Sequence, residues 1–294
     1  MKPPPFEYAR PESVPEVLSL LSEDPDGTSL LAGGQSLVPM LNMRMAQPAV
    51  VVDLNRVAGL DAIEEAGDGR IRFGAMVRQR RVERDPLVCE RLPLMAEAAR
   101  HIAHPAIRTR GTVGGSLAHA DPAAELPPTV TALDGRLLVR GQGGERSVPA
   151  ADFFLGPLTT AVEPGEMLVA VEVAAPPDGS GHAFAEFART HGAFALAAAA
   201  AVVHVDQGGA IDHAALALAG VGSTPYVPGW LSEAALGEVP GEALFARLGA
   251  RVREEVEPFD DIHGNADYRK RLAGVLARRA LTEAAARANG RTAR

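Results

Sequence analysis

Two short segments of the chain combine paired glycines with hydroxyl or amide side chains, a composition suited to holding a phosphate group. The first is AGGQS (residues 32–36), which follows the apolar run of residues 29–31 and precedes a Leu/Met-rich segment with helical spacing. The second is GTVGGS (residues 111–116). Because glycine has no Cβ, its backbone N–H can approach a phosphate oxygen closely. The first segment taken alone is more typical of a simple strand-to-helix turn.

The two segments together favour a dinucleotide site. Loops of this kind on different parts of a fold can hold opposite sides of one pyrophosphate, which needs many N–H donors and few nearby carbon atoms. Ser36, Thr112 and Ser116 would add hydroxyl donors. Neither segment has the lysine of a P-loop or the G-x-G-x-x-G spacing of a Rossmann unit. The sequence therefore predicts binding by the backbone rather than by charge.

The elements expected around these segments mix helices with strands. Ser13 precedes Glu16 by three residues, which predicts a capped helix with Val17, Leu18 and Leu21 on its apolar face. A helix is also expected over residues 91–102. A long final helix is expected to begin after Asn265, with an apolar face made by Tyr268, Leu272, Val275, Leu276 and Ala280. Strands are expected at residues 28–31, 50–54, 70–74, 136–140 and 167–173.

The segment PPDGSG (residues 176–181) interrupts this pattern and predicts a domain boundary. Beyond it, expected strands at residues 184–188 and 213–220 suggest an antiparallel sheet. The Ala-rich run of residues 193–205 fits either a buried helix or a buried strand. The fold class is α+β, and the predicted units are residues 1–55, 56–176 and 177–294.

Composition excludes several classes of function. The 294 residues are 47% hydrophobic and carry a formal net charge of -8, which argues against a nucleic-acid-binding surface. Aromatic residues make up only 4%, too few for base-stacking platforms. The N-terminus has no apolar h-region, and no apolar run reaches membrane-span length. We therefore expect a soluble, cytoplasmic protein that binds no nucleic acid.

Several single residues allow two interpretations. Cys89 is either a reactive thiol or, more typically, a small buried residue on a helix. His101 and His104 have helical spacing but no third ligand at a spacing typical of zinc sites, so no metal site is predicted. Arg108 and Arg110 precede the second glycine segment, where they would either attract an anionic cofactor or lie on a solvated surface.

The chain resembles a known family over nearly its whole length. Besides AGGQS and TVGG, the segments GSLAHADPAAELP, PGEMLVAVEV, ALAGVGSTPYVP and DIHGNADYRKRLAGVLARRAL occur in the family's order. They resemble the FAD-binding medium subunit of the molybdenum hydroxylases, the flavoprotein chain of the carbon monoxide dehydrogenase and xanthine dehydrogenase family. The resemblance implies a two-subdomain FAD-binding domain of the vanillyl-alcohol-oxidase (PCMH) type. A smaller C-terminal α/β domain with an antiparallel sheet would follow it.

The resemblance also implies which residues bind FAD. The first pyrophosphate loop would be Ala32-Gly33-Gly34-Gln35-Ser36 with Leu37, and the second Gly111-Thr112-Val113-Gly114-Gly115-Ser116. Asp121 and Glu125 match positions along the flavin and its ribityl chain, Leu168 matches an apolar residue near the isoalloxazine ring, and His119 is a further candidate. At residues 192–195 many members have Gly-Asp-aromatic-Ala, whereas this chain has Gly-Ala-Phe-Ala, so no role is carried over there.

The resemblance implies a redox subunit without catalytic residues or a metal site of its own. FAD would receive electrons from a small 2Fe–2S subunit, which takes them from a large molybdopterin subunit, in a dimer of heterotrimers. Residues 119–125 would lie near that partner, with Ala123 and Leu126 at the contact. Two alternatives remain open: a stand-alone flavin oxidase with its own substrate pocket, and an interaction module that has lost FAD.

Overall fold

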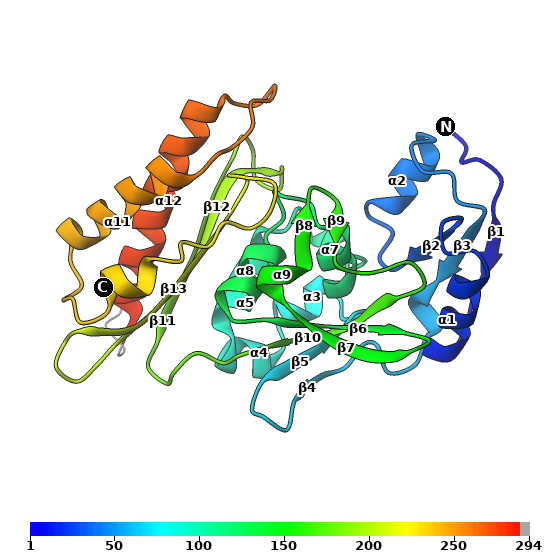
Figure 1. Ribbon diagram of the computed structural model, residues 1–294, viewed down its shortest axis with the longest axis horizontal. Helices are drawn as coiled ribbons and strands as arrows, with labels where there is room; N and C mark the ends of the chain where they lie inside the picture. The colour runs from blue at the N-terminus through cyan, green and yellow to red at the C-terminus, as the bar shows by residue number, and fades with distance from the viewer. Residues whose placement is uncertain (289–294) are drawn as a thin grey trace.

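The computed structural model describes residues 1–288, which form three groups of strands and helices along the long axis of the molecule (Figure 1). The N-terminal group lies at one end and the two longest helices lie at the other. A five-stranded sheet and its helices lie between them. None of the helices within residues 1–288 is long and apolar enough to cross a membrane.

The N-terminal group is a small parallel sheet of order β1-β3-β2. Helix α1 covers it with Val17, Leu18 and Leu21, all buried against Val52 of the central strand. Ser13 caps this helix as expected, because its Oγ accepts from the N–H of Glu16 at 3.4 Å. The elements are β1 (Glu7–Ala9), α1 (Val14–Glu23), β2 (Thr28–Leu31), α2 (Leu37–Asn42), β3 (Val50–Asp53) and the 3-10 helix η1 (Leu54–Arg56).

The middle group is an antiparallel sheet of order β4-β5-β10-β6-β7 with short helices on one face. Met167 and Val169 on its other face join the core of the N-terminal group. Its strands are β4 (Ile63–Glu65), β5 (Ile71–Gly74), β6 (Arg136–Gly141), β7 (Gly144–Pro149) and β10 (Met167–Val173), and β8 (Phe154–Gly156) pairs separately with β9 (Thr159–Thr160). Its helices are α3 (Gln79–Val82), α4 (Pro86–Arg91), α5 (Pro93–His101), α6 (Pro105–Arg108), α7 (Val113–His119), α8 (Leu126–Ala132) and α9 (Ala150–Phe153).

The C-terminal group is an antiparallel sheet of order β11-β12-β13, buried on both faces. Along β12, Ala197 and Ala199 face the helices that close the molecule, whereas Ala198 and Ala200 join the core of the middle group. A strand with two buried faces is apolar at every position, so the Ala-rich run is a strand. The elements are β11 (Gly181–Ala188), β12 (Ala195–Val205), β13 (Ile211–Ala219), α10 (Leu231–Ala235), α11 (Glu242–Glu255) and α12 (Ala266–Arg287).

Two helix predictions need correction. The single helix expected over residues 91–102 is divided between α4 and α5, because Pro93 disfavours helical geometry at Leu92. On α12, Asn265 is the cap as expected, but Val275 is exposed and does not belong to the buried face. That face includes Arg269, which is only 7% exposed and which donates to the carbonyl oxygens of Leu196 (2.6 Å) and Gly220 (3.2 Å).

Helices α11 and α12 approach each other through two glycines. A Cβ built on Gly274 would lie 2.6 Å from the carbonyl oxygen of Gly249, and one on Gly249 would lie 2.5 Å from that of Gly274. Side chains of ordinary size do not fit at this crossing.

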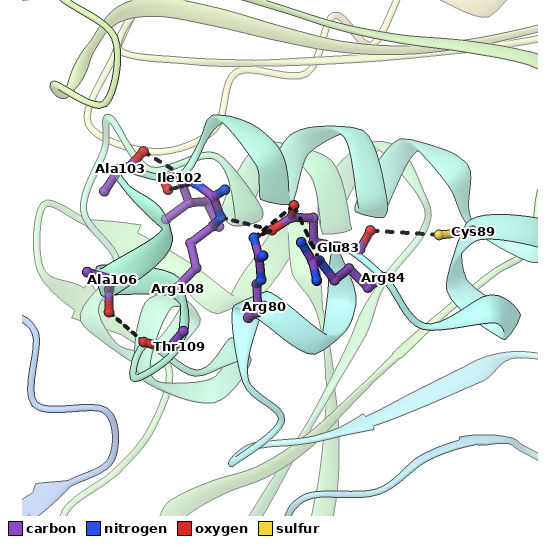
Figure 2. A network of polar contacts seen from close by, with 9 residues as sticks. All are labelled: Arg80, Glu83, Arg84, Cys89, Ile102, Ala103, Ala106, Arg108 and Thr109. Carbon is purple, nitrogen blue, oxygen red and sulfur yellow. Dashed lines mark hydrogen bonds and ion pairs between the residues drawn. The ribbon is translucent and has the colours of Figure 1, made fainter.

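A buried carboxylate fixes the chain that leads into the second glycine segment (Figure 2). Glu83 Oε2 accepts from Arg80 Nη1 at 3.1 Å and from Arg108 Nε at 3.1 Å. Arg108 also donates to the carbonyl oxygens of Ile102 (2.9 Å) and Ala103 (3.3 Å). Ala103 has a φ of 41°, a conformation that costs energy for a residue with a Cβ, and the bonds from Arg108 stabilise it.

The helix crossing gives the first prediction. Gly274→Val should lower the free energy of unfolding by about 1–3 kcal/mol, the usual cost of overpacking, because the two backbones must separate. Arg279→Val, at an exposed position of the same helix, is the matched control and should cost only the small helix penalty of a β-branched residue. Urea unfolding of the two variants measures the difference, and equal losses would contradict the close crossing.

The buried carboxylate gives the second prediction. Burial acts to raise the pKa of Glu83, but hydrogen bonds and charge from Arg108 and Arg80 outweigh it and lower that pKa below 4.5. The stabilisation is therefore present above pH 4.5 and is lost as the pH falls through the lowered pKa. Glu83→Gln should cost about 3 kcal/mol at pH 7, since it leaves Arg108 buried without its charge partner. Urea unfolding should show this loss shrinking below pH 4.5, and a pH-independent loss would count against the account.

Candidate functional site

The two glycine segments lie backbone against backbone. A Cβ built on Gly33 would lie 2.4 Å from the carbonyl oxygen of Arg110 and 2.8 Å from Cα of Gly111. No side chain fits in that space. The structure therefore brings together the two segments that the sequence predicted to act on one ligand, although one lies beside the parallel sheet and the other in the middle group.

Arg78 and Asn55 connect these two segments through side-chain hydrogen bonds. The Arg78 guanidinium donates to the carbonyl oxygen of Arg110 and to Oδ1 of Asn55. Asn55 Nδ2 in turn donates to the carbonyl oxygen of Ala32 at 3.1 Å. Burial and the nearby Arg110 lower the pKa of Arg78, which still remains a cation at physiological pH. A continuous set of hydrogen bonds thus links the first segment to the second.

The first segment presents a row of unpartnered backbone donors. Within residues 1–288, no protein oxygen accepts a hydrogen bond from the N–H groups of residues 33–37. Gly34 has a φ of 74°, which glycine adopts without strain. Gln35 and Ser36 are exposed, and Gln35 Nε2 donates to the carbonyl oxygen of Gly33 at 3.1 Å. Successive free N–H groups in such a turn form a concave site for an anion.

The second segment differs, because the fold itself uses most of its N–H groups. Val113 donates to the carbonyl oxygen of Val77 at 2.9 Å, and Gly114 donates to that of Ala75 at 2.8 Å. The N–H of Gly115 is taken by the capping Thr112 Oγ1 at 3.0 Å. The glycines serve close packing, since a Cβ on Gly114 would lie 2.5 Å from the Cβ of Ala75. The segment therefore offers its half-buried Ser116 hydroxyl rather than a row of amides.

The other candidate residues lie along the chain that follows the second segment. His119 ends α7, and Asp121 Oδ1 accepts from the N–H of Ala123 at 2.9 Å. Glu125 precedes α8. Leu168 on β10 is 6% exposed and packs in the main core of the middle group. Leu126, expected at a partner contact, is fully buried with 0% exposure, so that expectation is wrong for this residue.

Two carboxyl groups near this segment have strongly raised pKa values. Burial raises the pKa of Glu125 to about 8, with smaller contributions from the charges of Glu186 and Asp121. Burial also raises the pKa of Glu186, on β11, to about 7. Perturbed carboxyl groups of this kind occur preferentially at functional sites.

Three single-residue interpretations are corrected or decided by the structure. Cys89 lies on α4 as expected, but it is exposed, so it is not a packed core residue. Arg108 neither faces solvent nor points to a ligand, because Glu83 and two carbonyl groups bind its guanidinium. Arg110 is exposed, and its backbone carbonyl, not its side chain, takes part in the contact between the segments. In residues 1–288, no three His, Cys, Asp or Glu side chains are placed to hold a metal ion.

Sequence reasoning missed Asn55, Arg78 and Glu186. Asn55 lies in η1 directly after β3, and Arg78 directly precedes α3, positions at which polar residues are ordinary. Glu186 lies two residues after Phe184, on the same inward face of β11. A carboxylate in phase with a buried aromatic residue was the one sequence signal that could have indicated it. At residues 192–195, Phe194 is 74% exposed and Gly192 packs against His104 and Ala103.

The first segment fits a diphosphate group. It offers unpartnered amides with no carboxylate side chain among residues 32–37, and the Arg78 guanidinium lies at the contact between the two segments. Beside the second segment, Gln79 Oε1 is buried without a hydrogen-bond partner in the described part of the chain. This arrangement fits an anion held by the backbone, as the resemblance to FAD-binding subunits implies.

Comparison with known proteins gives the family. Residues 4–176 match the model of the FAD binding domain in molybdopterin dehydrogenase, and residues 182–284 match that of the CO dehydrogenase flavoprotein C-terminal domain. The nicotine 6-hydroxylase medium subunit of Paenarthrobacter nicotinovorans is 42% identical over 98% of this chain and 100% of its own length.

Two further proteins agree with this assignment. The 6-hydroxypseudooxynicotine dehydrogenase complex subunit alpha of the same organism is 39% identical over 98% of this chain and 97% of its own. A solved structure of carbon monoxide dehydrogenase from Hydrogenophaga pseudoflava, lacking the Mo-pyranopterin moiety, superposes with a TM-score of 0.94 at 38% identity, over 98% of this chain and 100% of that one. These relatives are subunits of oxidoreductases. The chain belongs to the family of FAD-binding flavoprotein subunits of the molybdopterin dehydrogenases, and FAD is its cofactor.

Proposed function

We propose that this chain is the electron-transfer subunit of a molybdenum hydroxylase and that the row of free amides at residues 33–37 binds the FAD pyrophosphate. This row is the observation that carries the proposal, because five successive amides without protein partners among residues 1–288, from buried Gly33 to exposed Gln35 and Ser36, can all turn to one ligand. The full proposed set is Ala32, Gly33, Gly34, Gln35, Ser36, Leu37, Gly111, Thr112, Val113, Gly114, Gly115, Ser116, His119, Asp121, Glu125 and Leu168.

The residues of this set would have different roles in binding FAD. Gly33 to Leu37 supply backbone donors, and Ser116 supplies a hydroxyl. The glycines of residues 111–115 supply close packing that keeps the first loop in position. Leu168 supports an apolar ring, and Glu125 adds a carboxyl group whose raised pKa keeps it largely uncharged at pH 7. The two FAD-binding subdomains would be residues 1–55 and 56–176, with residues 177–294 as the C-terminal domain.

The chemistry belongs to the cofactor, and the protein supplies its position. When bound, FAD would supply the redox chemistry between a partner that donates electrons and an external acceptor. The donor would be a small 2Fe–2S subunit fed by a large molybdopterin subunit, in a dimer of heterotrimers. A single cysteine cannot ligate an iron–sulfur cluster alone, so the cluster must come from another chain. Relatives act on nicotine or carbon monoxide, and the large subunit would select the substrate. We place the complex in the cytoplasm.

The loop contact gives a prediction about cofactor content. Gly33→Ala should weaken FAD binding at least about tenfold, equivalent to about 1.4 kcal/mol, because the new Cβ would lie 2.4 Å from the carbonyl oxygen of Arg110 and push the loops apart. Gly67→Ala is the matched control, since nothing lies within 4 Å of a Cβ there. FAD released per folded chain measures the effect. Full flavin content in Gly33→Ala would refute the proposed cradle.

The electron-transfer role gives a prediction about partners. The isolated chain should bind FAD and remain unreduced when substrates of the relatives are added without oxygen. The complex with both partner subunits should show bleaching of the flavin absorbance with the same substrate. Turnover by the isolated chain would favour the stand-alone oxidase. A colourless chain that cannot rebind FAD would favour the interaction module.

A further inference from the structure

The contact between the middle and C-terminal groups contains a line of polar side chains. Every second side chain of β11 lies on the face that packs against α5, and these are His182, Phe184 and Glu186. Glu97 and His101, one helical turn apart on α5, lie opposite them. Helix α8, which follows Glu125, packs against α5 and the same sheet.

The carboxyl groups at the two ends of this line differ in their hydrogen bonds and ion pairs. Glu97 Oε2 lies 3.4 Å from His182 Nε2 and accepts from Arg287 Nη1 at 2.9 Å. Glu186, in contrast, has a side chain only 7% exposed, and its Oε2 has no hydrogen-bond partner among the described residues. The nearest ion-pair candidate is His101 Nδ1 at 3.7 Å, too far for a hydrogen bond. The His101 ring packs on Phe184, with 5.1 Å between ring centroids.

The surroundings of Glu186 do not supply a cation to compensate an ionised carboxylate. Burial is the largest cause that lowers the pKa of His101, despite the opposing charge of Glu97. Arg287 is already bound to Glu97 and Glu283, and Arg108 is bound to Glu83. The titratable and charged groups that face this region from the packed elements are Glu97, His101, His104, Arg108, Asp121, Glu125, His182, His191 and Arg287.

An unpaired carboxylate in such a place is costly, so the group remains protonated to a higher pH than usual. Raised pKa values of about 7 for Glu186 and about 8 for Glu125 agree with this. The two groups are coupled, because the charge of Glu186 raises the pKa of Glu125. The His101 side chain, whose Nδ1 lies 3.7 Å from Glu186 Oε2, is 35% exposed, which gives this end of the line access to water.

We propose that Glu186 and Glu125 titrate as a coupled pair: the charge of the buried Glu186, which no nearby cation compensates, keeps the carboxyl group of Glu125 neutral at the flavin site. This inference rests on the proposed function, in which Glu125 belongs to that site. Its chemical content is separate, however: two carboxyl groups of one chain hold protons that ordinary glutamates release, and removal of one changes the pKa of the other.

Infrared titration of the flavin-free chain tests the coupled titration directly, since the carbonyl band of a protonated carboxyl group is separate from the bands of a carboxylate. At pH 6.5, where ordinary glutamates are ionised, the wild type should show a protonated band. Glu125→Gln and Glu186→Gln should each remove about half of it, as expected when two groups contribute. Glu172→Gln, whose carboxylate pairs with Arg72 at 3.3 Å outside this contact, is the matched control and should leave the band unchanged.

The coupling has its own signature. In Glu186→Gln, the remaining band should disappear at a lower pH than the Glu125 component does in the wild type. A wild-type chain without a protonated band at pH 6.5, or a Glu125 component that titrates identically in both proteins, would overturn the proposal. The wild-type measurement needs no variant, so it decides the first point even if a substitution prevents folding.

The stability of the chain provides a second readout. The folded chain keeps these protons above 4.5, the ordinary pKa of the side chain, where the unfolded chain has released them. Stability should therefore fall as the pH rises from 4.5 towards 8. Glu186→Gln should show a smaller fall over this range than Glu172→Gln in urea unfolding. An equal fall in the two variants would contradict the proton held at Glu186.

The midpoint potential of the bound flavin separates this inference from the proposed function. If Glu125 lies at the flavin, the pH at which the potential changes slope should move down in Glu186→Gln and stay in place in Glu172→Gln. Coupled titration of the two carboxyl groups in the infrared, with no change in the flavin potential, would remove Glu125 from the flavin site. It would also refute the flavin part of the proposal.

Discussion

The site depends on one steric constraint: the backbone at Gly33 lies so close to the carbonyl oxygen of Arg110 that no Cβ fits between them. This contact joins a loop beside the parallel sheet to a loop of the middle group. Hydrogen bonds from Arg78 and Asn55 cross the same contact. Arg78 donates to the carbonyl oxygen of Arg110 in one loop and to Asn55, which donates to the carbonyl oxygen of Ala32 in the other. A pair of loops fixed in this way is preorganised, so cofactor binding need not order them.

The two loops look alike in sequence and differ in what they can do. The N–H groups of the first loop remain free for a ligand. Those of the second loop donate to the carbonyl oxygens of Ala75 and Val77 and to Thr112 Oγ1. The second loop is held in turn by Arg108, whose buried ion pair with Glu83 supports the strained Ala103. Rigid support of one loop thus allows the other to keep unsatisfied donors facing outward.

Much of the fold could be predicted from sequence because its signals are local. The Ser13 cap, the Asn265 cap and the apolar strand at residues 167–173 follow from short-range rules. The Ala-rich run could not be assigned, since a strand buried on both faces and a buried helix have the same composition. The roles of Arg78, Arg108 and Glu186 depend on partners far away in the chain, and no local pattern reveals those. The paired glycines indicated both loops, but not which one has free amides.

Hydrogen exchange of individual backbone amides, with and without FAD, distinguishes the roles of the two loops. FAD should slow exchange strongly at residues 33–37, whose N–H groups have no partner in the described part of the protein. Exchange at residues 113–115 should change little, because these N–H groups are already bonded within the fold. Equal protection of both loops, or protection at residues 113–115 alone, would contradict the unequal roles assigned to them.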